Sequence, residues 1–84
     1  MTIQIRLFAV LREKAGRADL VLDLPPGSSV TDAASALQQK IPAIGAVLDR
    51  AAFAVNQSYV DRGTVLKDGD ELALIPPVSG GSGE

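Results

Sequence analysis

The stretch Thr2-Ile3-Gln4-Ile5-Arg6-Leu7-Phe8 alternates strictly, with an aliphatic side chain at every second position. Side chains of a β-strand point to opposite faces in turn, so this spacing predicts a half-buried strand over residues 2–8. The aliphatic residues form its buried face. Phe8 falls on the other, polar face, which makes it a candidate contact residue for a partner.

Residues 18–24 alternate in the same way and are predicted to form a second strand, antiparallel to the first. The sequence between the two strands, AVLREKA at residues 9–15, favours a short helix that Gly16 ends as a C-cap glycine does. Pro25-Pro26-Gly27 then breaks the second strand, because proline cannot continue a sheet ladder. The chain is therefore expected to open with two strands joined by a helical connection.

A longer helix is predicted to follow at residues 29–41. Ser29 or Thr31 can cap its start, because a hydroxyl there accepts a bond from a free backbone N–H. Its apolar residues recur with the spacing of one helical stripe, namely Val30, Ala33, Ala34, Leu37 and Ile41. Pro42 ends this helix or starts a second, short one.

Further strands are predicted at residues 52–56, at residues 59–60 and, after the tight turn of residues 67–70, at residues 71–75. This order lets the first and last strands lie parallel in the centre of a sheet, as a right-handed crossover favours. We therefore predict one α+β domain over residues 1–75 with the β-grasp, or ubiquitin-like, fold. In that fold a mixed sheet carries one main helix packed on one face.

The composition narrows the classes of function. The 84-residue chain has a net charge of −2 and no basic block, which argues against a nucleic acid or an anionic membrane as partner. It contains no Cys and no His, so the usual nucleophile–base pairs and the commonest transition-metal ligands are missing. We expect no bound cofactor, no metal, and a cytoplasmic protein that is not an enzyme on its own.

Residues 76–84, Pro-Pro-Val-Ser-Gly-Gly-Ser-Gly-Glu, are predicted to form a flexible glycine-rich C-terminal tail beyond the domain. The two prolines stiffen its start, because each ring fixes φ. The glycines let the following backbone bend and pass through a narrow channel. A frayed terminus is the plain alternative, so the interpretation depends on whether the domain is of a kind that carries a working tail.

Three motifs together resemble one family. They are Phe8-Ala9-x-Leu11-Arg12-Glu13-x-x-Gly16, Ala54-Val55-Asn56-Gln57-x-x-Val60, and Leu66-x-Asp68-Gly69-Asp70-Glu71-Leu72-Ala73 followed by Pro76-Pro77-Val78-Ser79-Gly80-Gly81. A Gly-Gly pair alone carries no such signal, but its combination with the Asp-Gly-Asp-Glu turn and the prolines is specific. Through these motifs, residues 2–81 resemble the small subunit of molybdopterin synthase, a sulfur carrier of the ubiquitin-like superfamily.

The resemblance implies a mechanism in which the chain supplies its tail and no catalytic side chain. An activating enzyme uses ATP to adenylate the carboxylate of Gly81, which Gly80 precedes, and a persulfide sulfur converts the adenylate into a thiocarboxylate. The tail then enters the large subunit of molybdopterin synthase. There its sulfur passes to the pterin precursor of the molybdenum cofactor.

The resemblance also implies which residues contact these partners. The positions assigned to partner binding are Phe8, Tyr59, Leu74, Pro76, Pro77, Val78 and Ser79. Phe8, Tyr59 and Leu74 would form an apolar docking patch on the domain itself. The alternation of the last strand groups Leu74 with Leu72, however, and leaves open which of the two faces the core.

The last three residues depart from the family pattern, which ends at Gly-Gly. Here residues 82–84, Ser-Gly-Glu, follow, so the Gly81 carbonyl belongs to an amide that cannot be adenylated. The three residues are a native extension that a protease removes, a linker left by cloning, or a sign that the chain is a non-covalent ubiquitin-like interaction module. For a working carrier, the sulfur acceptor stays open between the pterin and thiamine, cysteine or another thiolated metabolite.

Overall fold

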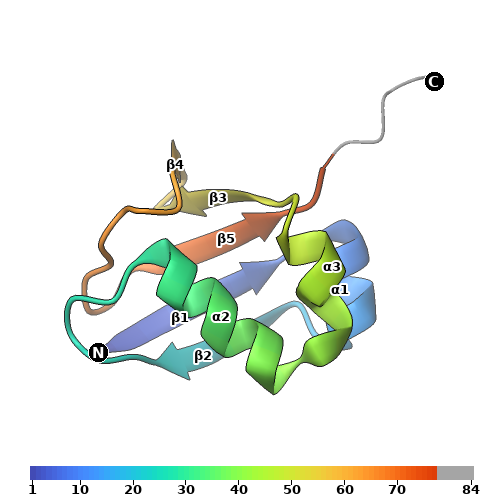
Figure 1. Ribbon diagram of the computed structural model, residues 1–84, viewed down its shortest axis with the longest axis horizontal. Coiled ribbons are helices and arrows are strands. Elements are labelled where there is room, and N and C mark those ends of the chain that lie inside the picture. The colour runs from blue at the N-terminus through green and yellow to red at the C-terminus, as the bar shows by residue number, and fades with distance from the viewer. Residues whose placement is uncertain (78–84) are drawn as a thin grey trace.

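The computed structural model describes residues 1–77. Their strands form a five-stranded sheet in the order β2-β1-β5-β3-β4 (Figure 1). The strands are β1 (Thr2–Leu7), β2 (Asp19–Asp23), β3 (Ala52–Val55), β4 (Ser58–Val60) and β5 (Glu71–Ile75). The helices are α1 (Ala9–Ala15), α2 (Val30–Lys40), the 3-10 turn η1 (Pro42–Ile44) and α3 (Gly45–Leu48). None of the helices in this part of the chain has the length and apolar character needed to cross a membrane.

The first and last strands form the central, parallel pair, as predicted. Ile5 lies opposite Leu72, and Leu7 lies opposite Leu74. The pairs β1–β2, β3–β5 and β3–β4 are antiparallel. Helix α2 crosses one face of the sheet, while α1 and α3 lie at the end where β1 and β5 stop (Figure 1). This is the β-grasp architecture, so the predicted fold class is confirmed.

Helix α2 begins with a capping box. The backbone N–H of Ser29 donates to Asp32 Oδ2 (2.9 Å), and the backbone N–H of Asp32 donates to Ser29 Oγ (3.3 Å). These bonds satisfy donors that the start of a helix leaves without partners. Ser29 is therefore the cap, and the hydroxyl of Thr31 donates instead to the backbone oxygen of Arg62 (2.8 Å).

The core is mainly aliphatic and is filled by the predicted faces of the strands and of α2. The buried residues of β1, β2 and α2 are Ile3, Ile5, Leu7, Leu20, Leu22, Val30, Ala33, Ala34 and Leu37. The ring of Phe53, also buried, lies 4.8 Å from the guanidinium carbon of Arg62. Arg62 Nη2 donates to the backbone oxygen of Leu48 at 2.6 Å, so this side chain holds the loop after β4 against α3.

The Asp68-Gly69-Asp70-Glu71 motif fixes the register at the start of β5. Asp68 Oδ1 accepts from the backbone N–H of Thr2 at 2.7 Å, and the N–H of Gly69 donates to Thr2 O at 2.8 Å. Gly69 has a φ of +86°, which glycine adopts without the strain that a Cβ would cause. Asn56 donates to Asp70 Oδ1 at 3.0 Å and accepts from the N–H of Glu71 at 3.1 Å. The motif therefore ties β1 and the β3–β4 turn to β5.

Candidate functional site

Strand β5 carries the root of the tail. It ends at Ile75, and Pro76 and Pro77 are the last residues that the structure describes. A hollow of about 240 Å³ at this point is lined by Val10, Ala46, Val47, Arg50 and Pro77. The tail therefore leaves the domain beside α1 and α3. The predicted site residues that lie outside the described part of the chain are Val78, Ser79, Gly80 and Gly81, and their roles stay predictions.

The face of the sheet that α2 does not cover carries a row of small residues. Arg6 of β1 lies opposite Ala73 of β5, which in turn lies opposite Ala54 of β3. Ala54 lies opposite Tyr59 of β4. Because alanine side chains are short, the face is hollowed by about 320 Å³ between larger side chains. This Phe8–Tyr59 hollow is lined by Arg6, Phe8, Ala54, Gln57, Tyr59, Glu71, Ala73 and Ile75.

Two of the predicted contact residues, Phe8 and Tyr59, meet at this hollow. Phe8 is 40 % exposed and Tyr59 is 73 % exposed, so both present apolar surface to solvent. Phe8 lies just outside β1, which ends at Leu7, and occupies the N-cap position of α1. Exposed aromatic side chains that gather around small residues are typical of surfaces that bind other proteins. The structure thus joins two residues from distant parts of the sequence in one candidate docking surface.

Leu74 does not belong to this surface, and its predicted place in the docking patch is corrected. Its side chain is 0 % exposed, and so is that of Leu72. Leu74 lies between Leu7 of β1 and Phe53 of β3, which are both buried. Both leucines of β5 therefore face the core, because alternate residues of a strand share one face.

Three residues that line the Phe8–Tyr59 hollow could not be identified from the sequence alone, namely Ala54, Ala73 and Ile75. Alanine carries no chemical mark of a binding site, and an isoleucine in an apolar strand reads as a core residue. The sequence signal that points to this surface is the polar face of residues 2–8, because Phe8 lies on that face. Residues of β5 that share this face belong to the same surface, but identifying them requires the register between the two strands.

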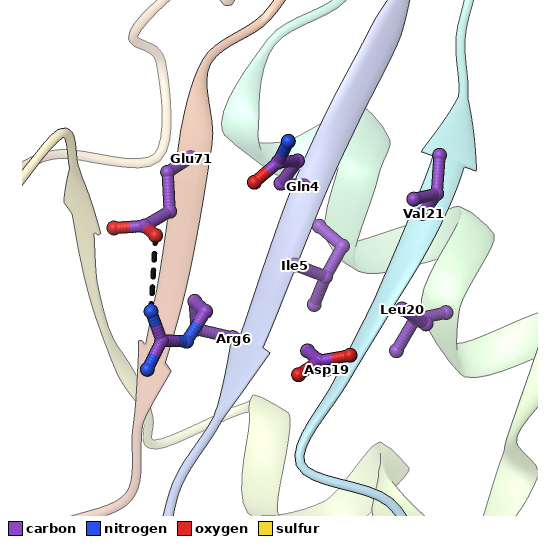
Figure 2. Close-up of a pocket in the computed structure, with 7 residues that line it drawn as sticks. All are labelled: Gln4, Ile5, Arg6, Asp19, Leu20, Val21 and Glu71. Carbon is purple, nitrogen blue, oxygen red and sulfur yellow. Dashed lines mark hydrogen bonds and ion pairs between the residues drawn. The ribbon is translucent and has the colours of Figure 1, made fainter.

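An ion pair crosses the open face between β1 and β5. Arg6 Nη1 lies 3.1 Å from Glu71 Oε2, and the Arg6 guanidinium carbon lies 5.9 Å from the ring centroid of Phe8. Both charged side chains are partly exposed, so the pair contributes little to stability. Arg6 thus contacts Glu71 and lies near the Phe8 ring, and it also borders a second hollow of about 440 Å³ between β1 and β2 (Figure 2).

The described residues form a surface suited to holding another protein. Ile75 lines the Phe8–Tyr59 hollow and is followed directly by Pro76, so a partner bound at the hollow also holds the root of the tail. Within residues 1–77, no group of three or more His, Cys, Asp or Glu is placed to hold a metal ion. The arrangement can therefore position the tail relative to a partner.

The chain is similar to known proteins over most of its length. The sequence profile of the ThiS family matches residues 5–81. The molybdopterin synthase sulfur carrier subunit of Chlamydomonas reinhardtii is 40 % identical over 84 residues, covering 96 % of this chain and 100 % of that protein. Small archaeal modifier protein 1 of H. volcanii superposes with a TM-score of 0.85 at 32 % identity, covering 92 % of this chain and 98 % of the other. The complex of subunits 1 and 2 of molybdopterin-converting factor from Helicobacter pylori contains a chain with a TM-score of 0.69 at 26 % identity, covering 95 % and 99 %.

Proposed function

This chain belongs to the ThiS family, and on that basis we propose that it is the sulfur carrier subunit of a molybdopterin synthase. The observation that carries the proposal is the course of β5. This strand contributes Ala73 and Ile75 to the open face and leads directly into the prolines and the Gly80-Gly81 sequence. A partner that binds the open face is thereby placed at the origin of the tail. The H. pylori complex, in which a related chain is bound to a second subunit, supports a large subunit as that partner.

In the proposed reaction, the reacting group is the C-terminal carboxylate of Gly81. An activating enzyme transfers AMP from ATP to this carboxylate and releases pyrophosphate, so in this proposal ATP is bound by the activating enzyme and not by the carrier. The terminal sulfur of a persulfide attacks the acyl carbon, and AMP leaves. A second thiol then cleaves the S–S bond, which leaves a glycyl thiocarboxylate and a disulfide. The thiocarboxylate sulfur forms a bond to the pterin precursor, and water then cleaves the acyl C–S bond of the resulting thioester. The sulfur stays on the pterin, and the carrier returns to a carboxylate.

The part of this chain in the reaction is to position one carbonyl carbon. The stretch from Pro77 to Gly81 reaches on the order of 15 Å when it is extended. The domain can therefore stay on the partner's surface, held at Phe8 and Tyr59, while Gly81 reaches a site inside. Glycine suits this position because it has no Cβ to meet the wall of a narrow channel.

Residues 82–84 have to leave before the first step. While Ser82 follows Gly81, the Gly81 carbonyl is an amide, which offers no carboxylate oxygen to attack ATP. We therefore include in the proposal a protease that cuts after Gly81. We propose that these steps take place in the cytoplasm, where ATP is available to the activating enzyme.

Intact mass spectrometry of the protein isolated from its own host tests this proposal. We expect a mature chain that ends at Gly81, with a fraction heavier by the exchange of one oxygen for sulfur. A fraction of this kind that disappears when the activating enzyme is deleted would identify the thiocarboxylate. A population that always retains Glu84 would contradict the carrier function.

The docking surface is tested by the substitution Tyr59→Ala. Removing this 73 % exposed ring is expected to weaken binding of the large subunit. An aromatic anchor at an interface contributes about 2 kcal/mol, which corresponds to roughly 30-fold in Kd. Calorimetric titration of the variant against the large subunit measures this change, and Phe8→Ala is expected to act in the same direction.

The matched control is Val65→Ala, because Val65 is 58 % exposed and does not line the hollow. This variant should bind like the original chain. If Val65→Ala weakens binding as much as Tyr59→Ala does, the Phe8–Tyr59 hollow is not the docking surface.

A further inference from the structure

Strand β2 forms an edge of the sheet, with β1 as its neighbour on one side among the described strands (Figure 1). Met1 and Leu24 exchange two backbone hydrogen bonds, of 2.7 and 2.9 Å, and the N–H of Leu7 donates to Ala18 O at 2.8 Å. In an antiparallel ladder such bonded pairs recur at every second residue, so Leu20 and Leu22 also direct their backbone groups to β1. The backbone groups of the intervening residues of β2 therefore point outward from the sheet.

The outward residues of β2 are Asp19, Val21 and Asp23, and all three side chains are exposed on the open face of the sheet. Val21 is 56 % exposed. The edge thus presents an aliphatic side chain between two carboxylates. Asp19 and Val21 also line the hollow that Gln4 and Arg6 border (Figure 2). The same three residues offer both the free backbone groups and the side chains that a new strand would meet.

The two carboxylates are not neutralised within the described part of the chain. Arg6 lies directly opposite Asp19 in the register, but its guanidinium is turned to Glu71, at 3.1 Å (Figure 2). Within residues 1–77, the side chain of Asp19 forms no ion pair and no hydrogen bond. In the same part of the chain, the side chain of Asp23 accepts one hydrogen bond, a long one of 3.4 Å from the hydroxyl of Thr2. Two cations from outside can therefore pair with these side chains.

We propose that the β2 edge binds a partner strand with an aliphatic residue and two basic residues. One basic residue lies two positions before the aliphatic residue, and the other lies two positions after it. An added antiparallel strand would form backbone bonds with Asp19, Val21 and Asp23, and its basic side chains would lie beside the carboxylates. A second copy of this chain does not fit. Antiparallel pairing of two β2 strands centred on Val21 places Asp19 opposite Asp23, and like charges directly opposite each other are destabilising.

The edge residues Asp19, Val21 and Asp23 do not line the Phe8–Tyr59 hollow of the proposed carrier function, although Arg6 and Glu71 border the hollows on both sides of β1. Tyr59 lies on β4, at the opposite edge of the sheet, and β1, β5 and β3 stand between the two edges. The chain can thus hold a basic strand at β2 while the Phe8–Tyr59 hollow and the tail are occupied. Failure of one proposal leaves the other intact.

The test is a titration of the 84-residue chain with two synthetic peptides, one containing Lys-Thr-Val-Thr-Lys and the other Glu-Thr-Val-Thr-Glu. In the free protein, the amides of Leu20 and Leu22 should exchange slowly with solvent, and those of Asp19, Val21 and Asp23 should exchange fast. The lysine peptide should protect these three amides, as measured by NMR. It should also bind about tenfold more tightly than the glutamate peptide at low salt, because two charge pairs change sign.

The double variant Asp19→Lys/Asp23→Lys should reverse this preference, and the neutral Asp19→Asn/Asp23→Asn should abolish it. The control Glu13→Lys/Asp49→Lys changes the net charge equally at exposed sites away from β2, and should retain the preference for lysine. If neither peptide protects the β2 amides, the aspartates only keep the edge from self-association, and the proposal is wrong. It is equally wrong if the control shifts the preference as much as the β2 variants do.

Discussion

A chain that ends at Gly81 is expected to accept sulfur, whereas the 84-residue chain is expected to accept none until residues 82–84 are removed. The reason is chemical. Adenylation requires a free carboxylate at Gly81, and in the longer chain this carbonyl is part of the peptide bond to Ser82. The difference should be complete rather than graded, because an amide oxygen has no charge with which to attack ATP and no route to an acyl adenylate.

Three lengths of the chain distinguish a carrier that must lose residues 82–84 from a non-covalent interaction module. Residues 1–81, 1–84 and 1–79 are each incubated with the activating enzyme, ATP and a sulfur donor, and the thiocarboxylate is measured by intact mass. The 1–79 chain keeps β5, which ends at Ile75, so it should fold and bind the large subunit but donate no sulfur to the pterin. This chain is the matched control for the fold.

Two results would contradict parts of this proposal. The first is a 1–84 chain that becomes loaded with sulfur while it retains Glu84, which would show that residues 82–84 need not be removed from a working carrier. The second is a 1–79 chain that performs every function of the 1–81 chain, which would identify a non-covalent interaction module. If the 1–81 chain is loaded but its sulfur does not reach the pterin, the acceptor is a different one, such as thiamine, cysteine or another thiolated metabolite.

Leu74→Ala is expected to lower the free energy of unfolding by about 2–5 kcal/mol, as large-to-small substitutions at buried leucines do. Leu74 is 0 % exposed and is flanked across the sheet by Leu7 and Phe53, so the substitution leaves a cavity between the two central strands and β3. Because small domains have total stabilities of about 5–15 kcal/mol, this loss removes a large share of the total. Urea denaturation followed by circular dichroism measures it.

Tyr59→Ala serves as the surface counterpart to this variant. Its free energy of unfolding should change by less than about 0.5 kcal/mol, while its affinity for the large subunit falls. Leu74→Met keeps the volume of the side chain and should cost less than about 1.5 kcal/mol, which shows that the effect is one of packing. A Leu74→Ala variant of normal stability that no longer binds the large subunit would restore Leu74 to the docking patch.

The candidate site was predictable in part. The exposed position of Phe8 follows from its place on the polar face of residues 2–8, and Tyr59 comes from the family resemblance. Leu74 could not be placed, because both faces of the last strand are apolar: Leu72 and Leu74 lie on one face, and Ala73 and Ile75 on the other. Alternation shows which residues share a face, but it shows the buried face only when the two faces differ in polarity.

The sequence by itself determines the elements of this protein and their order. Period-two alternation specifies β1 and β2 to within one residue at each end, an apolar stripe specifies α2, and Gly16 and Gly69 mark places where the chain turns. These signals are local, because each depends on side chains within a few residues of one another.

Only the tertiary structure decides how distant residues combine. The parallel register of β1 with β5 sends Leu74 into the core and brings Ala73 beside Arg6. The pairing of β3 with β4 brings Tyr59 to the same hollow as Phe8. Arg6 pairs with Glu71 although Asp19 also lies opposite it, which leaves the β2 edge acidic. Each of these outcomes depends on the alignment of separate strands, because a shift by one residue would exchange the two faces of a strand.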